Sequence, residues 1–268
     1  MKKLRTIIVL IVLLNFSATV LLGQENQEDK EHSGLMRSLD IKKHDIKRVG
    51  IFVYNGVNDL DAIGPRYVMK NMMGVEVLTI APDTDMVTTV MGLSFKPDVS
   101  MKDVDQLDIL IIPGGFKETI EQSYNQELLD WIKKIDQKTT YTASVCTGGW
   151  ILGKTGLLEG RKATGNWFKA EEMLKANGAE FTGERYTRDG KYWTSAGVTA
   201  GIDMSLAMLV ELTGKDYAQA VMLDMEYDPK APIEGGNVEN TDPAVLKWMF
   251  DMYDMMSKPV FDEMKKKN

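Results

Sequence analysis

The chain has few residues of the kinds that bind metals or form disulfides. It contains one cysteine and two histidines among 268 residues. Cys146 has no second cysteine to pair with, so no disulfide within the chain stabilises the fold. His32 and His44 lie in a polar N-terminal stretch, where we expect them to be solvated and not catalytic. The sequence therefore lacks the residues for a Cys/His zinc site, and we predict no metal.

An excess of positive charge is also missing. The chain has 32 Lys and Arg residues against 39 Asp and Glu residues, which gives a net charge of −7 at pH 7. Phosphate binding needs a basic face, so this balance argues against a nucleic-acid partner. Hydrophobic residues make up 44% of the sequence, as expected of a globular protein with one large or two small domains.

The apolar run at the N-terminus, Ile7–Leu14, is short. Lys2, Lys3 and Arg5 precede it, and small or polar residues follow it, in the order typical of a secretory signal. The run is shorter than the roughly 20 residues that a membrane-spanning helix needs. We predict that residues 1–23 are a signal peptide, with an uncleaved anchor as the alternative.

A signal peptide at this position implies that the mature chain is exported to the periplasm or secreted. No cysteine lies near the expected cleavage site, so a lipid anchor is not predicted, and we expect no stable membrane insertion after processing. Residues 24–47 are polar and charged with little periodicity, which is typical of a flexible linker. We expect a single domain over residues 48–268, ending in a C-terminal helix.

The stretch Thr140–Gly149 contains the most informative pattern. Its first half is rich in β-branched and aromatic residues, which favours a buried strand, and Trp150–Gly153 after it favours a helix. Ser144–Gly148 has the small-x-nucleophile-x-Gly pattern of a nucleophile elbow around Cys146. We expect N–H groups at the start of the helix to favour the thiolate. The alternative is a small, buried and inert side chain.

Two further segments place polar groups after predicted strands. Asp59 and Asp61 follow the first strand, where either residue can also cap the next helix. Gly114 and Gly115 follow an uninterrupted apolar run, which is typical of a strand covered on both faces. Glycines there let a ligand approach the backbone N–H groups, although glycines are also common in ordinary turns.

Predicted strands alternate with predicted helices along the chain. We expect strands over 48–54, 75–81, 86–90, 93–97, 107–112, 141–145, 162–164, 179–182, 185–187 and 191–195. We expect helices over 125–136, 168–177, 200–212, 215–224 and 243–256. This order favours a layered α/β domain with a mostly parallel sheet and helices on both faces. Ligand sites in such sheets lie at the carboxyl ends of the strands, where Asp61, Gly114, Gly115 and Cys146 all fall.

The last predicted helix has a candidate packing face. Val245, Trp248, Met249, Met252 and Met255 recur at helical spacing. A stripe of methionines is more often core than a soft-metal site, so we expect this face to be buried.

Four motifs together resemble a known family. They are Asp59–Pro65 (DLDAIGP), Ile112–Gly115 (IPGG), Ser144–Gly148 (SVCTG) and Thr194–Asp203 (TSAGVTAGID). In this order they are similar to the ThiJ/PfpI superfamily of class I glutamine-amidotransferase-like proteins. The late segment Glu226–Pro232 (EYDPKAP) resembles the isonitrile hydratase-like branch. The resemblance implies a flavodoxin-like three-layer sandwich, a homodimer, and no metal or organic cofactor.

The resemblance also implies roles for residues. Cys146 would be the nucleophile and Asp61 its acidic partner, while the backbone N–H groups of Gly115 and Thr147 would form an oxyanion hole. The substrate would be a small molecule that contacts four further residues, namely Gly114, Trp150, Asn166 and Trp167. For both tryptophans, packing is the alternative role.

The sequence departs from the superfamily at Asn166. Many members carry a histidine near this position, and the segment predicted to fold contains none. An amide cannot shuttle protons near neutral pH, so a Cys-His peptidase mechanism lacks its base. The hydratase chemistry depends on a cysteine and an acid, and we predict a cysteine-dependent hydration of an isonitrile to an N-substituted formamide. A glyoxalase-like activity on small aldehydes and a non-catalytic ligand-binding or redox-sensing module remain as alternatives.

Overall fold

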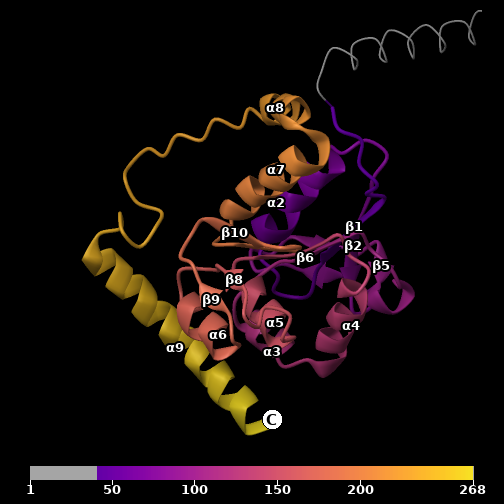
Figure 1. Ribbon diagram of the computed structural model, residues 1–268. Helices are drawn as coiled ribbons and strands as arrows, with labels where there is room; N and C mark the ends of the chain where they lie inside the picture. Colours follow the sequence, from indigo (N-terminus) through magenta and orange to yellow (C-terminus); the bar gives the residue numbers. More distant parts are fainter. Residues whose placement is uncertain (1–40, 268) are drawn as a thin grey trace, which may run out of the picture.

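The computed structural model describes residues 41–267 of the protein (Figure 1). The predicted signal peptide, residues 24–40 of the predicted linker and His32 lie outside these residues. The polar stretch before the first strand already contributes to the core, because Ile46 is buried. His44 is only partly exposed, and its Nδ1 atom is shielded from solvent without a hydrogen-bond partner, which contradicts the predicted solvation.

A seven-stranded sheet forms the centre of the described chain. The strands are β1 (Arg48–Phe52), β2 (Glu76–Ala81), β5 (Val99–Ser100), β6 (Ile109–Ile112), β7 (Tyr141–Val145), β10 (Tyr186–Asp189) and β11 (Tyr192–Ser195). Their spatial order is β10-β11-β7-β6-β1-β2-β5. All neighbouring pairs run parallel except β10 and β11, which form a hairpin. The predicted mostly parallel α/β fold is confirmed.

Helices cover both faces of the sheet, and this explains why the central strands are apolar throughout. Figure 1 shows α2 (Asp59–Lys70), α7 (Ala200–Thr213) and α8 (Lys215–Asp224) on one side. The other side carries α3 (Lys117–Gln122), α4 (Gln126–Asp136), α5 (Gly148–Lys154) and α6 (Ala170–Ala176). All four residues of β6 are buried, as expected of a strand with helices on both sides.

Short elements complete the domain. A two-stranded hairpin joins β3 (Val87–Thr88) to β4 (Ser94–Phe95), and β8 (Lys162–Ala163) pairs with β9 (Glu180–Phe181). A 3₁₀ turn, η1, spans Met101–Asp103. The sequence analysis did not predict β5, η1 or α3, because each is short and lacks a clear apolar period. Among the helices of residues 41–267, none combines the length and the apolar character needed to cross a bilayer.

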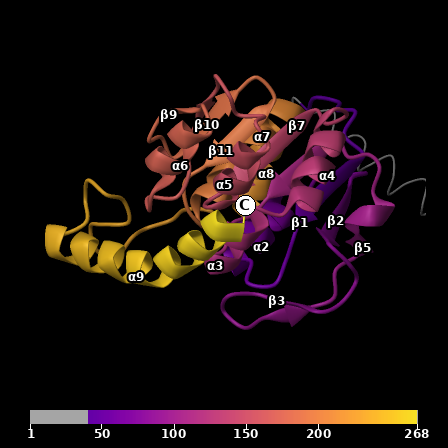
Figure 2. The ribbon, with the colours of Figure 1, turned by 90° about the horizontal axis from the view of Figure 1, so that it is seen from below.

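The C-terminal helix α9 (Pro243–Lys267) follows a segment without helix or strand and runs along the outer side of α6 toward α3 (Figure 2). It extends eleven residues beyond the predicted end, through Pro259. The predicted packing face is wrong for three of its members, since Val245, Trp248 and Met255 are 50%, 63% and 71% exposed. The helix instead buries Ser257 and Phe261, which lie on another face.

The face that α9 turns inward closes a second, smaller core. Trp150, Phe168, Ile120 and Phe261 are buried together there. The rings of Trp150 and Phe261 lie 5.7 Å apart. The C-terminal helix is therefore attached to the side of the domain formed by α3, α5 and α6.

Candidate active site

The central strands place three chain segments at one edge of the sheet. β6 pairs with β1 on one side and β7 on the other, so the carboxyl ends of these parallel strands lie side by side. Asp61 follows β1 in the first turn of α2, Gly114 follows β6, and Cys146 follows β7. The structure therefore brings together the three groups that the sequence placed after separate strands.

Cys146 occupies a sharp turn between β7 and α5. Its φ angle is 61°, a left-handed conformation that is rare for residues other than glycine. The turn brings Gly148 so close to β6 that a Cβ atom there would lie 2.1 Å from the carbonyl oxygen of Ile112. The glycine of the predicted nucleophile elbow is thus required by the backbone approach itself.

The thiol of Cys146 is nearly covered and has a defined partner. The residue is 5% exposed, and the Asn166 Nδ2 atom donates a hydrogen bond to Sγ over 3.2 Å. The Oδ1 atom of Asn166 accepts from the backbone N–H of Phe168 over 2.9 Å, which fixes the orientation of the amide. Asn166, predicted as a substrate contact, thus lies at the site and donates a hydrogen bond to the Cys146 sulfur.

Asp61 is the acidic group of the site. Its carboxyl group is fully buried and interacts with the thiol of Cys146. The backbone N–H of Gly114 donates to its Oδ2 atom over 3.2 Å, while Oδ1 has no hydrogen-bond partner within residues 41–267. A buried carboxylate oxygen without a partner is costly, so Oδ1 is a free hydrogen-bond acceptor in a residue that also interacts with the thiol.

Burial controls the protonation of both groups. It raises the pKa of Asp61 to about 7, although hydrogen bonds from Cys146 and Gly114 oppose the shift. Burial, and then the charge of Asp61, raise the pKa of the Cys146 thiol well above its usual range, against the hydrogen bonds from the Thr147 N–H and Asn166. The Thr147 N–H at the helix start does favour the thiolate, as expected, but desolvation of the sulfur outweighs this single donor and the pKa of the thiol is raised.

The predicted oxyanion hole is only half present. The backbone N–H of Thr147 is directed at Cys146, but the N–H of Gly115 donates to Thr147 Oγ1 over 3.1 Å. The Thr147 hydroxyl in turn donates to the Gly115 carbonyl over 3.0 Å. Gly115 thus anchors the Thr147 side chain, and Gly114 anchors Asp61.

A buried set of hydroxyl groups supports this anchor, and sequence reasoning missed it. Thr119 Oγ1 lies 3.4 Å from Thr147 Oγ1 and 2.8 Å from the Tyr54 hydroxyl. Both Tyr54 and Thr119 are buried. Neither belongs to a recognisable motif, because Tyr54 ends a strand segment and Thr119 lies in the unpredicted helix α3.

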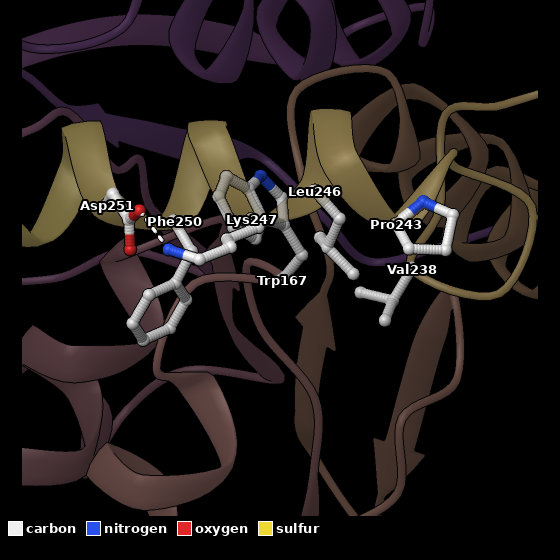
Figure 3. A pocket seen from close by; sticks show the side chains of 7 residues that line it. All are labelled: Trp167, Val238, Pro243, Leu246, Lys247, Phe250 and Asp251. Carbon is white, nitrogen blue, oxygen red and sulfur yellow. Dashed lines mark hydrogen bonds and ion pairs between the residues drawn. The ribbon is translucent and has the colours of Figure 1, made fainter.

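The two candidate tryptophans have different environments. Trp150 is 2% exposed and packs in the second core, so the structure assigns it to packing in place of the predicted substrate contact. Trp167 is only partly buried and lines a cavity of about 370 Å³ between its indole and the N-terminal half of α9. Figure 3 shows Leu246, Phe250 and Val238 around the same cavity.

Tyr253 of α9 is a site residue that sequence reasoning did not find. Burial, Cys146 and Asp61 all raise the pKa of its phenol, so its ring lies within electrostatic range of both groups. The helical spacing of apolar residues indicated a different face of this helix as the packing face, and Tyr253 is not on it. Within the described part of the chain, no group of three or more His, Cys, Asp or Glu side chains is arranged to hold a metal ion.

A mostly parallel sheet, a cysteine at a sharp strand-to-helix turn and a buried acid beside it together define a class of α/β proteins built around a nucleophile elbow. The chain belongs to the DJ-1/PfpI family, whose model matches residues 47–211. It is 35% identical to an isonitrile hydratase of Pseudomonas putida over 199 residues, which cover 74% of this chain and 86% of that enzyme.

A solved structure and a regulator extend these similarities. The structure of a ThiJ/PfpI family protein from Pseudomonas syringae superimposes with a TM-score of 0.79 at 31% identity, over 84% of this chain and 93% of that one. The HTH-type transcriptional regulator CdhR of Pseudomonas aeruginosa is 29% identical over 131 residues, which cover 48% of this chain and 38% of the regulator. The chain is thus similar both to an enzyme and to a transcriptional regulator.

Proposed function

We propose that this protein is a cysteine-dependent hydratase that converts a small isonitrile, R–N≡C, and water to the formamide R–NH–CHO. The observation that carries the proposal is the pairing of a neutral, buried Cys146 thiol with a buried Asp61 whose Oδ1 atom has no partner. The 35% identity to an isonitrile hydratase over most of both chains supports the same chemistry.

The first step needs a base because the thiol is protonated. The Asp61 carboxylate takes the thiol proton while the sulfur bonds to the terminal carbon of the isonitrile. The carboxylic acid then returns this proton to the same carbon. The product is a thioimidate, R–N=CH–S, on Cys146, and Asp61 is again a carboxylate.

The second step adds water to the thioimidate carbon. Asp61 removes a proton from the attacking water and delivers it to the nitrogen as the C=N double bond becomes a single bond, so Asp61 is again a carboxylate. The carbon–sulfur bond then breaks, the new hydroxyl becomes the formamide carbonyl, and its proton returns to sulfur. One water is consumed and the thiol is regenerated, so atoms and charges balance.

Asn166 stabilises sulfur during both steps without exchanging protons. Its amide donates to Sγ, and it occupies the place where a peptidase mechanism would need an imidazole. His44 is the single histidine among residues 41–267, and it precedes β1 at the sheet edge opposite Cys146. The site therefore suits addition chemistry that a carboxyl group alone can serve.

The test is turnover of a panel of alkyl and aryl isonitriles, with formamide quantified by mass spectrometry. We expect Cys146→Ala to abolish formamide formation and Asp61→Asn to reduce it by roughly 10³-fold, within the usual range for a general base. The exposed acid Asp85 provides a matched control, since Asp85→Asn should leave the rate unchanged. Turnover that survives in Cys146→Ala would refute the proposal.

The similarity to CdhR favours a second candidate, a non-catalytic ligand-binding module. Panel compounds would then bind without turnover.

A redox sensor is less well supported, because the raised pKa of Cys146 keeps its thiol protonated and the thiolate is the form that reacts with oxidants. Lactate formed from methylglyoxal would instead identify a glyoxalase-like enzyme.

We also propose that the chain is exported and forms a homodimer. The charge and apolar pattern of residues 1–23 supports export, and the resemblance to the family supports the dimer. N-terminal sequencing of the secreted or periplasmic protein tests the first proposal, and an intact N-terminus would contradict it. Light scattering tests the second, because a monomer mass would contradict it.

A further inference from the structure

The aromatic ring of Tyr253 bridges the two loops that flank the nucleophile. Its ring centroid lies 4.9 Å from that of Phe116, which follows Gly115 directly. It lies 5.2 Å from Trp167 and 5.3 Å from Phe168, which follow Asn166. Because Asn166 binds the Cys146 sulfur, Tyr253 closes the side of the site that faces α9.

The phenol is available as a hydrogen-bond donor. Its hydroxyl has no hydrogen-bond partner among residues 41–267. Burial and the nearby Cys146 and Asp61 raise its pKa, so it stays protonated at neutral pH. A protonated phenol without a partner beside a reactive thiol can donate to a bound substrate.

The position of α9 is fixed close to Tyr253. The neighbouring Asp254 forms an ion pair with Lys169, which follows Phe168 and has a left-handed φ angle of 54°. Phe261, eight residues after Tyr253, is buried in the second core. Figures 1 and 2 both show α9 alongside α6, with its C-terminal end near α3. The contacts hold Tyr253 at the site although the segment before α9 is exposed.

We infer that Tyr253 is a substrate-contacting residue supplied by the C-terminal helix, outside the segment that the family model matches. Its hydroxyl donates a hydrogen bond to the substrate nitrogen, and its ring forms an aromatic wall with Phe116, Trp167 and Phe168. This wall favours an uncharged aromatic or branched substituent R. The inference deepens the proposed hydratase function and rests on it for the identity of the substrate.

The hydrogen bond has a defined role in the second step. When water attacks the thioimidate carbon, negative charge develops on nitrogen, and a donor aimed at nitrogen stabilises that charge. No proton is transferred to or from Tyr253 itself. Loss of the hydroxyl should therefore lower kcat, whereas loss of the ring should also raise KM for aromatic substrates.

Two variants of the full chain separate these effects. We expect Tyr253→Phe to lower kcat about tenfold with little change in KM, as for the loss of one hydrogen bond. We expect Tyr253→Ala to raise KM for an aryl isonitrile at least about tenfold more than for methyl isonitrile. Met255→Ala is the matched control on the same helix, because Met255 is 71% exposed, and it should retain both constants.

Alkylation of Cys146 provides a second readout that does not need turnover. The rates with a benzyl halide and a methyl halide are compared for each variant. A benzyl-to-methyl rate ratio that falls several-fold in Tyr253→Ala, but not in Met255→Ala, supports the aromatic wall. An unchanged ratio overturns it.

The two proposals fail in distinguishable ways. Wild-type kcat and KM in both Tyr253 variants, with an inactive Cys146→Ala, would overturn the inference and leave the hydratase function intact. A wild-type protein without turnover would refute the hydratase function, and the alkylation ratio alone would then decide whether Tyr253 contacts the ligand.

Discussion

At the scale of single residues, the side chains of Asp61 and Cys146 determine the chemistry of the site, and both are buried. Asp61 is shielded from water by the turn after β6, and Cys146 by Asn166 and the elbow. Removal of water disfavours the charged form of each group. The acid consequently titrates near neutral pH and the thiol remains protonated, which suits proton transfer between them.

The pH dependence of turnover follows from this acid. The first step requires the Asp61 carboxylate, and burial raises the pKa of Asp61 to about 7. We therefore expect kcat/KM for a neutral isonitrile to rise about tenfold per pH unit below pH 7 and to level off above it. The measurement is kcat/KM between pH 5 and 9. A flat profile through pH 7 would contradict the assigned role.

The same shift affects folding stability with a defined sign. The unfolded chain releases the Asp61 proton near the ordinary value of 3.8, whereas the folded chain keeps it up to about pH 7. Because the folded state binds this proton over the interval, the free energy of unfolding falls as pH rises from about 4 to about 7.

Asp61→Asn removes this pH dependence. The free energy of unfolding of the wild type should fall between pH 4 and pH 8, whereas that of the variant should lack this fall. We therefore expect the difference, variant minus wild type, to increase by up to about 4 kcal/mol between these pH values. Urea denaturation at both pH values measures the difference, and Asp85→Asn, an exposed acid, controls for general charge effects. Equal stability differences at the two pH values would show that Asp61 is not held protonated by the fold.

At the element scale, the elbow between β7 and α5 depends on one glycine. We expect Gly148→Ala to destabilise the fold by about 3 kcal/mol, because its Cβ atom would overlap the carbonyl oxygen of Ile112. Gly149→Ala is the control in the same helix. Its Cβ atom would meet its nearest neighbour at 3.6 Å, so we expect no loss of stability. Thermal unfolding of both variants measures the contrast, and similar losses would contradict it.

At the scale of the whole molecule, residues 41–267 contain two hydrophobic cores of unequal size. The larger core lies between the sheet and its helices, and the smaller one joins α9 to the domain through Phe261 and its neighbours. α9 is reached through an exposed segment, residues 226–242, that contains no helix or strand. Docking of α9 therefore depends mainly on the smaller core.

Phe261→Ala tests this dependence. Loss of a buried phenylalanine costs about 3 kcal/mol, so we expect α9 to detach and open more often and a glutamate-specific protease to cleave within the helix, after Glu263, roughly 100-fold faster. Trp248→Ala is the aromatic control, since Trp248 is 63% exposed on the same helix. Equal cleavage rates in the two variants would show that Phe261 does not hold the helix.

Much of the fold was accessible from the sequence, because local patterns reflect it directly. β6 is apolar throughout and could be predicted as a doubly covered strand, and the α4 periodicity indicated its buried face. The elbow around Cys146 was recognisable because backbone crowding restricts Gly148 to glycine. Asp61 was found as an acid after a strand, although capping explained it equally well.

The sequence by itself determined the layered α/β architecture, the elbow and the edge of the sheet where the site lies. Only the tertiary structure decided the protonation of Cys146, because desolvation depends on how many chain segments cover the sulfur. It also decided which face of α9 packs inward. Val245, Trp248 and Met255 form an apolar period, but the rings around Phe168 select Tyr253 and Phe261 instead. A helical period identifies faces, whereas the partner surface determines which face is buried.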